Sequence, residues 1–233
     1  MASPPEISIS VVIPTLNEQP VIAEALATAR AEGVERILAD GGSSDGTVET
    51  AREHGVEQVV RCEPGRSRQM AAGWRAASGA VLLFLHADTR LEPGWADAVR
   101  AALADPEVAG GAFRLRFASD GPAYRLLELG VRLRCRIGGL PYGDQALFVR
   151  RAVLEAAGGI PAVPIFEDLD LARTIGRAGR LALLPERAST SPRRYQRDGV
   201  GRVVVRNLLA LGAYLIGIDR ERVARWYRGS RPA

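Results

Sequence analysis

The pattern of apolar and polar residues alternates short apolar runs with longer amphipathic stretches. The most continuous run, 81–85, reads Val-Leu-Leu-Phe-Leu, which is typical of a strand buried on both faces in a parallel sheet. Strands alternating with helices predict βαβ units, so we expect an α/β fold with a mostly parallel central sheet flanked by helices. The other expected elements of the first half are strands at 7–13, 36–39 and 58–61 and helices at 18–31, 47–54 and 66–77.

The second half of the chain has a different pattern. Apolar and polar residues alternate at 108–117, as in a strand with one polar face. The other expected elements are helices at 94–104, 124–137, 166–177 and 203–218, a strand entered from the loop at 142, and a short strand at 180–184. No repeat or linker divides the chain. We therefore expect a single domain over 1–233, with a nucleotide-binding half at 1–90, an acceptor and catalytic half at 91–200, and C-terminal helices at 201–233.

Two polar side chains, His86 and Asp88, follow the buried run at 81–85. On an extended backbone, residues two apart point the same way. Ligands of open α/β sheets bind beyond the carboxyl ends of the strands. The pair therefore suits a divalent cation held through oxygen and nitrogen. The alternative is that Asp88 only caps the turn into the next helix and His86 is half exposed.

Composition narrows the class of protein. The 233 residues are 47% apolar and 25% charged, with a net charge of +4, as in a soluble globular protein. All 31 positive residues are Arg, which suits bidentate binding of phosphate, although a GC-rich genome explains the same bias. Cys62 and Cys135 match no disulfide or metal spacing, which favours a cytoplasmic location. Scattered Arg residues argue against nucleic acid as a partner, and no apolar run is long enough to span a membrane.

Three segments carry further candidate groups. Asp40 ends a strand before a glycine-rich loop, where its carboxylate can accept hydrogen bonds from a ribose or base, or simply belong to a tight turn. Arg66 begins a helix, a position that suits a pyrophosphate or a solvated basic face. Glu167 and Asp168 begin another helix, where acids either complement the helix dipole or take a proton from an attacking hydroxyl.

The order of these motifs resembles that of the family 2 glycosyltransferases with the GT-A fold. The motifs are Pro-Thr-x-Asn-Glu, Asp-Gly-x-Ser-x-Asp-Gly-Thr, Gly-Arg-x-x-Gln-Met, x-Ala-Asp, Gly-Asp-Gln and Glu-Asp, spread over 7–227. Leu-His-Ala-Asp-Thr, Tyr-Gly-Asp-Gln and Thr-Ser-x-Arg-Arg are similar to a subgroup labelled radical-SAM/selenodomain-associated glycosyltransferases. The resemblance implies a metal-dependent, inverting transfer of a sugar from a nucleotide-diphospho-sugar to an acceptor hydroxyl.

The resemblance also implies roles for residues that bind the donor. By this carry-over Pro14, Thr15 and Glu18 touch the base and ribose, Asp40 binds the base or ribose, and Arg66 lies near the nucleoside or diphosphate. Asp88 matches the last acid of the Asp-x-Asp motif, which binds a divalent cation bridging the diphosphate. His86 stands in place of the first acid. Because Mn²⁺ tolerates imidazole better than Mg²⁺ does, Mn²⁺ is the expected cofactor.

For the chemical step, the resemblance assigns the general base to Asp168. The residues that would shape the sugar and acceptor pocket are Glu167, Gly143, Asp144 and Gln145. Arg193 and Arg194, which follow Ser191-Pro192, would bind phosphate or close over it as a lid, and on the residues alone they are equally a surface pair.

Two other functions and two positions for the last apolar helix stay open. A sugar nucleotidyltransferase also has a nucleotide-binding half, but its Gly-rich loop with Arg and Lys is replaced here by the sequence at 14–18. A non-catalytic sugar-nucleotide-binding module is the third reading. The helix at 203–218 packs on the core or in a homodimer, or it lies on the inner face of a membrane near a lipid-linked acceptor. Nearby Arg residues suit anionic lipid: Arg132, Arg134, Arg136, Arg202 and Arg206.

Overall fold

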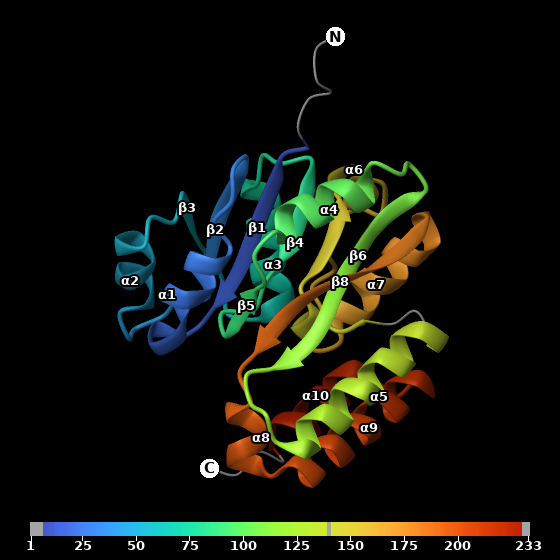
Figure 1. Ribbon diagram of the computed structural model, residues 1–233. Coiled ribbons are helices and arrows are strands. Elements are labelled where there is room, and N and C mark those ends of the chain that lie inside the picture. Colours follow the sequence, from blue (N-terminus) through green and yellow to red (C-terminus); the bar gives the residue numbers. More distant parts are fainter. Residues whose placement is uncertain (1–6, 139–140, 230–233) are drawn as a thin grey trace.

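The computed structural model describes residues 7–138 and 141–229, and its centre is an eight-stranded sheet with helices on both faces (Figure 1). The strands are β1 (Ile9–Thr15), β2 (Val34–Asp40), β3 (Gln58–Arg61), β4 (Val81–Phe84), β5 (Thr89–Leu91), β6 (Val108–Phe117), β7 (Leu147–Arg150) and β8 (Arg180–Thr190). Their order in the sheet is β3-β2-β1-β4-β7-β6-β8-β5. Four of the seven pairings are parallel, so the expected α/β fold with a mostly parallel sheet is confirmed.

The helices connect these strands and close the lower end of the sheet. They are α1 (Gln19–Thr28), α2 (Thr47–Glu53), α3 (Arg66–Ala76), α4 (Trp95–Leu103), α5 (Pro122–Gly138), α6 (Arg151–Ala156), α7 (Glu167–Ala178), α8 (Arg193–Asp198), α9 (Val200–Leu215) and α10 (Arg220–Gly229), with a single 3₁₀ turn, η1 (Gly143–Gln145). Figure 1 shows α5, α8, α9 and α10 together below the sheet, and we call these four helices the lower layer.

Alternation along the central strands divides the core between the two faces of the sheet. Val11 and Ile13 pack with α1 and α4, while Val12 faces α3 on the other side. All three side chains are fully buried, as the apolar run of β1 predicts. Gly73 on α3 allows a close contact, since a Cβ at this position would overlap the Val12 side chain. Truncating a core residue of this kind to Ala typically costs about 2–5 kcal/mol.

Several expected boundaries differ from the structure. The buried run forms β4 only as far as Phe84, and His86 and Asp88 lie in the turn that follows, so the extended backbone assumed for them was wrong. The strand expected at 180–184 continues to Thr190, because its second half pairs with β6 and with the short strand β5. The last apolar helix, α9, begins at Val200. Helices α6 and α8 were not expected, while α10 lies in the region 201–233 where C-terminal helices were expected.

Ion pairs fasten the lower layer to itself and to α7. The Asp198 carboxylate accepts hydrogen bonds from Arg197 on α8 and Arg206 on α9, at 2.8 and 3.1 Å. These hydrogen bonds, the one from Arg197 foremost, lower the pKa of Asp198 to about 2. On α7, Asp170 pairs with Arg220 and accepts a hydrogen bond from the Tyr214 hydroxyl. In the described part of the chain no helix has both the length and the apolar character needed to cross a membrane.

Candidate active site

Two adjoining cavities lie where β1 and β4 end, at the carboxyl edge of the parallel half of the sheet. The larger, which we call the central cavity, has a volume of about 310 Å³, within the range of small-molecule sites. The smaller, the side cavity, has about 230 Å³ and is lined by residues at the end of β1 and just after it, among them Pro14, Thr15 and Glu18. Three residues line both cavities: Arg66, His86 and Asp88. One elongated ligand can therefore reach from the side cavity into the central one.

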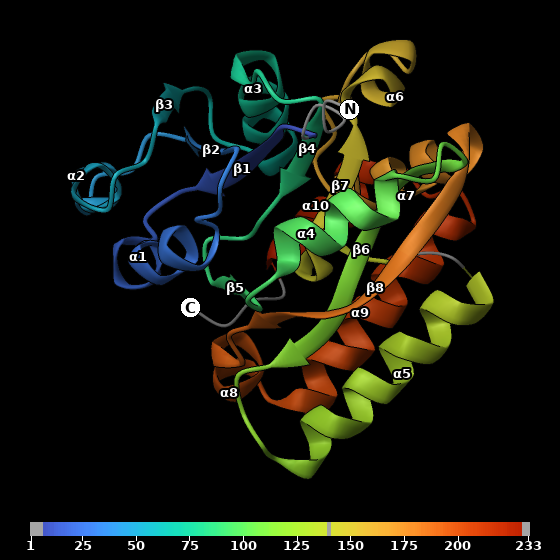
Figure 2. The same cartoon turned by 45° about the horizontal axis from the view of Figure 1, so that its top comes forward.

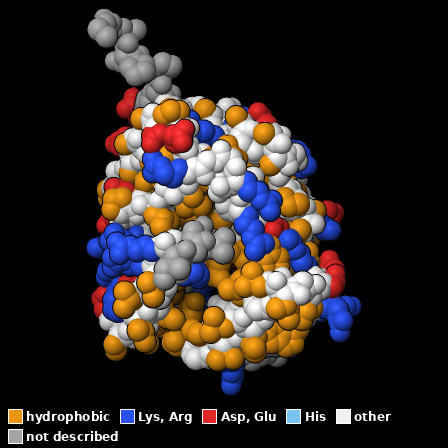
Figure 3. Space-filling view, turned by 90° about the vertical axis from the view of Figure 1, so that its right-hand side faces the viewer, with side chains coloured by type: hydrophobic (Ala, Val, Ile, Leu, Met, Phe, Trp, Pro, Cys, Tyr) orange, Lys and Arg blue, Asp and Glu red, His pale blue; other side chains and the backbone are white. Residues whose placement is uncertain are grey.

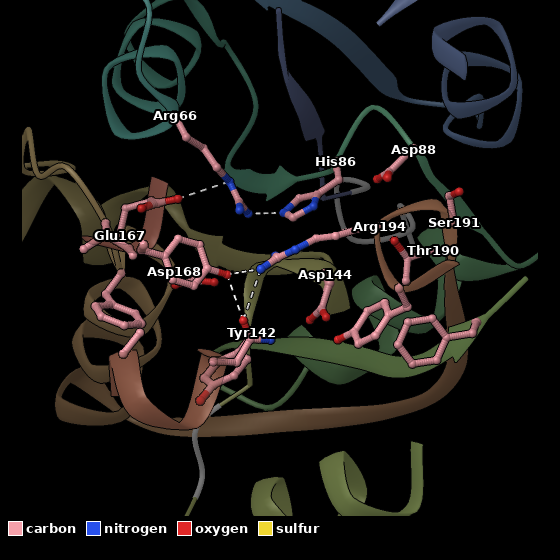
Figure 4. A pocket seen from close by; sticks show the side chains of 17 residues that line it. Arg66, His86, Asp88, Tyr142, Asp144, Glu167, Asp168, Thr190, Ser191 and Arg194 are labelled. Carbon is pink, nitrogen blue, oxygen red and sulfur yellow. Dashed lines mark hydrogen bonds and ion pairs between the residues drawn. The ribbon is translucent and has the colours of Figure 1, made fainter. Parts of the chain in front are cut away.

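Arg66 joins the residues after β4 to the start of α7. Its guanidinium lies 3.2 Å from the Glu167 carboxylate and donates to Nε2 of His86 (Figure 4). Burial, and then the Arg66 cation, hold the pKa of His86 well below 6.5, so the imidazole is neutral. Glu167 is 7% exposed, and burial raises its pKa against the opposing effect of Arg66. The Arg66–Glu167 ion pair thus places one cation and one buried acid at the edge of the central cavity.

Asp88 lies at the junction of the two cavities. Its carboxylate is mostly buried, and burial raises its pKa, while the nearby Arg193 guanidinium lowers it. Nε of Arg193 is 3.4 Å from Asp88, and a terminal nitrogen of the same guanidinium is 2.6 Å from the Glu18 carboxylate. Arg193 comes from α8, far along the chain from both acids. Its cation therefore bridges two acids that the sequence assigned to donor binding.

Asp168 lines the central cavity and is held there by the backbone of Gly143. The backbone N–H of Gly143 donates a hydrogen bond of 2.8 Å to Oδ2 of Asp168. A Cβ at position 143 would overlap the end of the Arg66 side chain and crowd His86, so a larger residue there requires Arg66 to move. Asp88 and Asp168 both line this cavity, so the two candidate acids belong to one site.

Asp144 is an acid of the central cavity with a strongly raised pKa. Burial raises its pKa to about 6, and its Oδ1 has no hydrogen-bond partner among the described residues. Burial, together with the Asp144 charge, raises the pKa of the Tyr195 hydroxyl to about 12. Figure 4 shows the Asp144 carboxylate below Arg66 and His86, in the same opening. An unsatisfied carboxyl in this position suits a ligand that donates a hydrogen bond.

Two of the expected site residues hold the loops in place and do not line either cavity. Asp40 is 1% exposed, and its carboxylate accepts hydrogen bonds from the backbone of Gly42 and Ser43 in its own loop. Gln145 is 3% exposed; its amide donates to the carbonyl of Phe113 at 3.0 Å and its oxygen accepts from the Tyr142 N–H. The turn-forming alternative for Asp40 thus describes its contacts in this structure.

The lower layer contributes Arg194, which the sequence analysis named, and aromatic residues that it did not. Arg194, unlike its neighbour Arg193, lines the central cavity, where its guanidinium donates to Asn207 on α9 and Tyr227 on α10. Tyr195 packs edge-on against Phe117 with ring centroids 5.0 Å apart. These aromatic residues carry no local motif, and only the approach of α8, α9 and α10 to the sheet brings them together. Gln69 was also missed; its amide donates to the carbonyls of Thr15 and Ala39 and so ties the ends of β1 and β2.

The donor set near Asp88 fits a divalent cation only if the ligand supplies further oxygens. Within 7–138 and 141–229, no three His, Cys, Asp or Glu side chains cluster closely enough to hold a metal. Mg²⁺ bound with substrate phosphates commonly takes only one or two protein carboxylates, and Asp88 can be one of them. His86 fits less well, because its Nε2 already accepts from the Arg66 cation. The expectation of a metal ligand at His86 is therefore not supported by this contact.

Comparison with known proteins agrees with this geometry. The family model described as glycosyl transferase family 2 matches residues 10–153, more than half of the chain, and the chain belongs to this family. Uncharacterized glycosyltransferase Rv0539 of Mycobacterium tuberculosis is 32% identical over 87 residues, and so is its counterpart Mb0553 of Mycobacterium bovis. The matching segment covers 37% of this chain and 39% of the length of each of these relatives.

Solved structures share the fold at low sequence identity. The mannosyltransferase PcManGT from Pyrobaculum calidifontis, in complex with GDP-Man and Mn²⁺, has a TM-score of 0.67 at 22% identity, covering 88% of this chain and 61% of its own. Glucosyl-3-phosphoglycerate synthase from Mycobacterium tuberculosis, with Mn²⁺, UDP and phosphoglyceric acid, has a TM-score of 0.65 at 22% identity, covering 91% and 80%. These similarities confirm the expected GT-A type of fold.

Proposed function

We propose that this protein transfers a sugar from a nucleotide-diphospho-sugar to an acceptor hydroxyl with inversion at the anomeric carbon. The observation that carries the proposal is that Asp88 and Asp168, which follow different halves of the sheet, line one cavity together with Arg66. One acid belongs at the diphosphate and the other at the attacking hydroxyl. The family match, and the nucleotide and Mn²⁺ or Mg²⁺ in the names of similar structures, support the donor class.

The donor would extend from the side cavity into the central cavity. Pro14, Thr15 and Glu18 surround the nucleoside end, and the diphosphate lies where the two cavities meet. Arg66 and Arg193 are the cations at this junction, and Arg provides charge-assisted hydrogen bonds to phosphate. Asp88 would hold a divalent cation together with diphosphate oxygens, and such a cation supplies positive charge for the leaving group. Asp40 would act indirectly, by fixing the loop behind the nucleoside.

The sugar and the acceptor would meet in the central cavity beside Asp168. The carboxylate of Asp168 accepts the proton of the acceptor hydroxyl, whose oxygen forms the new bond to the anomeric carbon. The bond from that carbon to the diphosphate oxygen breaks at the same time, and the diphosphate leaves with the electron pair. A single displacement of this kind inverts the configuration. Gly143 holds Asp168 through its N–H, and Glu167 positions Arg66.

Asp144 would recognise a hydroxyl of the sugar or acceptor. Its Oδ1 is unpaired among the described residues and lies in the central cavity, where a donated hydrogen bond satisfies a group that is otherwise costly to bury. The tyrosine and phenylalanine rings nearby suit the faces of a sugar ring or an apolar acceptor. Our proposal also includes membership of the radical-SAM/selenodomain-associated subgroup, which the motifs Leu-His-Ala-Asp-Thr and Tyr-Gly-Asp-Gln support.

A screen of sugar nucleotides tests the donor class directly. We would measure thermal stability with UDP-, GDP-, dTDP- and CDP-linked sugars, each with Mn²⁺, with Mg²⁺ and with chelator. A ligand at a hundred times its dissociation constant adds about 2.7 kcal/mol to the free energy of unfolding. One nucleotide class should stabilise the protein in a cation-dependent way, and its sugar should then turn over. Stabilisation by none of them would contradict the proposal, and turnover that needs a nucleoside triphosphate would favour a nucleotidyltransferase.

A further inference from the structure

Helix α5 exposes an apolar stripe to solvent. Leu126, Leu129 and Leu133 lie three and four positions apart, and their side chains are 71%, 58% and 57% exposed. This spacing places them on one face of the helix. The opposite face carries the buried Cys135, so α5 has an inner side packed on the molecule and an outer side of leucines. A helix of a globular protein normally turns its apolar face to the core.

Helix α9 repeats this arrangement. Its buried residues are Val203, Arg206 and Ala210, while Leu208, Leu209 and Leu215 are 62%, 57% and 58% exposed. Figures 1 and 2 show α5 and α9 running alongside each other in the lower layer. Figure 3 shows hydrophobic side chains gathered over the lower part of the molecule, where these helices lie, with basic side chains around them. Apolar patches of this kind mark interaction surfaces.

Positive charge is concentrated in the lower layer, which contains α5 and α9. The segments 122–138 and 193–229 contain thirteen Arg and four acidic residues, a net charge of +9, whereas the whole chain carries +4. The rest of the chain is therefore negative, at −5. On α5 the exposed Arg132 and Arg136 follow Leu129 and Leu133 at positions three later, so they share the apolar side of the helix. Arg stems bury along apolar surface while the guanidinium stays in a polar layer.

We propose that the outer face of α5 and α9 docks on an anionic lipid bilayer. Leucines would enter the boundary between head groups and acyl chains, and the Arg guanidinium groups would contact lipid phosphates. Pairing with a second copy through a two-fold axis would set two basic lower layers against each other and is disfavoured by repulsion. α9 also lines the central cavity with Asn207 and Ala210, so docking would hold the cavity beside the membrane. If the proposed sugar transfer holds, an amphiphilic acceptor would then be within reach.

Co-sedimentation with lipid vesicles tests the proposal without any activity measurement. The intact protein should bind vesicles that contain phosphatidylglycerol, should bind phosphatidylcholine vesicles more weakly, and should lose binding as salt is raised. Arg132→Gln and Arg136→Gln should each weaken binding about fivefold. Arg52→Gln, the same change on α2 in the negative part of the chain, should leave it unaltered. Vesicle binding needs no sugar nucleotide and no acceptor. The membrane proposal can therefore be refuted while the proposed sugar transfer is confirmed, and the reverse.

Leucine variants separate a membrane surface from a protein interface. Leu129→Ser and Leu208→Ser should fold normally, since both side chains are exposed, and should reduce vesicle binding. The absence of wild-type binding to anionic vesicles would overturn the proposal. So would an equal loss of binding in Arg52→Gln. A dimer of the wild type, seen by sedimentation equilibrium and abolished by Leu208→Ser, would instead assign the face to a second copy of the chain.

Discussion

The Arg193 guanidinium lies 3.4 Å from the carboxylate of Asp88, although 105 positions separate the two residues. The same guanidinium also pairs with Glu18. One cation therefore contacts two carboxylates at the junction of the two cavities. A diphosphate with its cation would enter this junction by exchanging partners with Arg193. The contact thus links α8 to the ends of β1 and β4, at the place where donor binding is proposed.

Replacing Arg193 should weaken phosphate binding selectively. In Arg193→Ala we expect the affinity for the nucleoside diphosphate to fall about 10- to 100-fold, because a charge-assisted hydrogen bond contributes about 1.5–3 kcal/mol. The affinity for the nucleoside alone should be unchanged, and calorimetry can measure both. Arg197→Ala on the same helix is the matched control, since Arg197 pairs with Asp198. An equal loss for the nucleoside and the diphosphate would assign Arg193 to the loop structure instead.

Gly143 lies so close to Arg66 that an added methyl group should move the Arg66 side chain. In Gly143→Ala the Cβ would displace the Arg66 guanidinium from its contacts with His86 and Glu167. We expect sugar transfer to fall about 100-fold, as for small displacements of catalytic groups. The control is Gly176→Ala on α7, where added Cβ has open space. That variant should stay active and gain about 0.5–1 kcal/mol of stability, because Ala suits a helix better than Gly. Full activity of Gly143→Ala would refute the packing argument.

Asp144 should make the protein less stable at alkaline pH. Burial raises its pKa from 3.8 to about 6, so between these values the folded protein holds a proton that the unfolded chain releases. Stability therefore falls as pH rises through this window, and the full cost is present above it. Asp144→Asn should increase the free energy of unfolding near pH 8 by about 1–3 kcal/mol, with a smaller gain toward pH 4.

Urea unfolding at the two pH values measures this effect, and turnover measures the function of the same group. Asp97→Asn, on a side chain that is 84% exposed, provides the control with the same chemical change. We expect Asp144→Asn to lose turnover while it gains stability, as for a group retained for binding. A gain in stability that is the same at both pH values would show that burial of charge at position 144 is not its cause.

The pKa of His86 reports on the Arg66 contact. The chain has only two His residues, so the imidazole signals in an NMR titration are easily assigned, with His54 as the internal reference. We expect a pKa for His86 below 6.5, because burial and the Arg66 cation both disfavour the imidazolium. In Arg66→Gln that pKa should rise. Because the folded state disfavours protonation, stability should fall as pH drops below 6.5. A pKa unmoved in Arg66→Gln would show that burial alone sets it.

The fold was predictable mainly where local periodicity and core burial agree. The segments that form β1 and β4 are buried on both faces of the sheet. Their runs of apolar residues were therefore enough to predict them as strands. Thr89 to Leu91 was not identified as a strand, because three residues carry no period and the pairing with β8 supplies the structure. The second half of β8, up to Thr190, was not identified as strand for the same reason.

For the candidate site, sequence reasoning named the acids and several of the Arg residues, but not the contacts between them. Asp88 and Asp168 stand in recognisable motifs after a strand and at a helix start. The separation of Arg193 and Arg194 into two cavities depends on how α8 meets the sheet, which no local pattern specifies. Asn207 and Tyr227 come from helices whose packing is set by long-range ion pairs. The Gln145 side chain is buried because its amide donates to the carbonyl of Phe113, a residue distant in sequence.

The most direct test of the account is the single-turnover rate of Asp168→Asn with the donor found in the screen. Asn keeps the size of the side chain and an oxygen to accept from Gly143, but it cannot take a proton. The account predicts a rate about 10²- to 10⁴-fold lower, with the dissociation constant of the donor unchanged within about twofold. A rate for Asp168→Asn equal to that of the wild type, at full donor occupancy, would contradict the proposal that this carboxylate is the base.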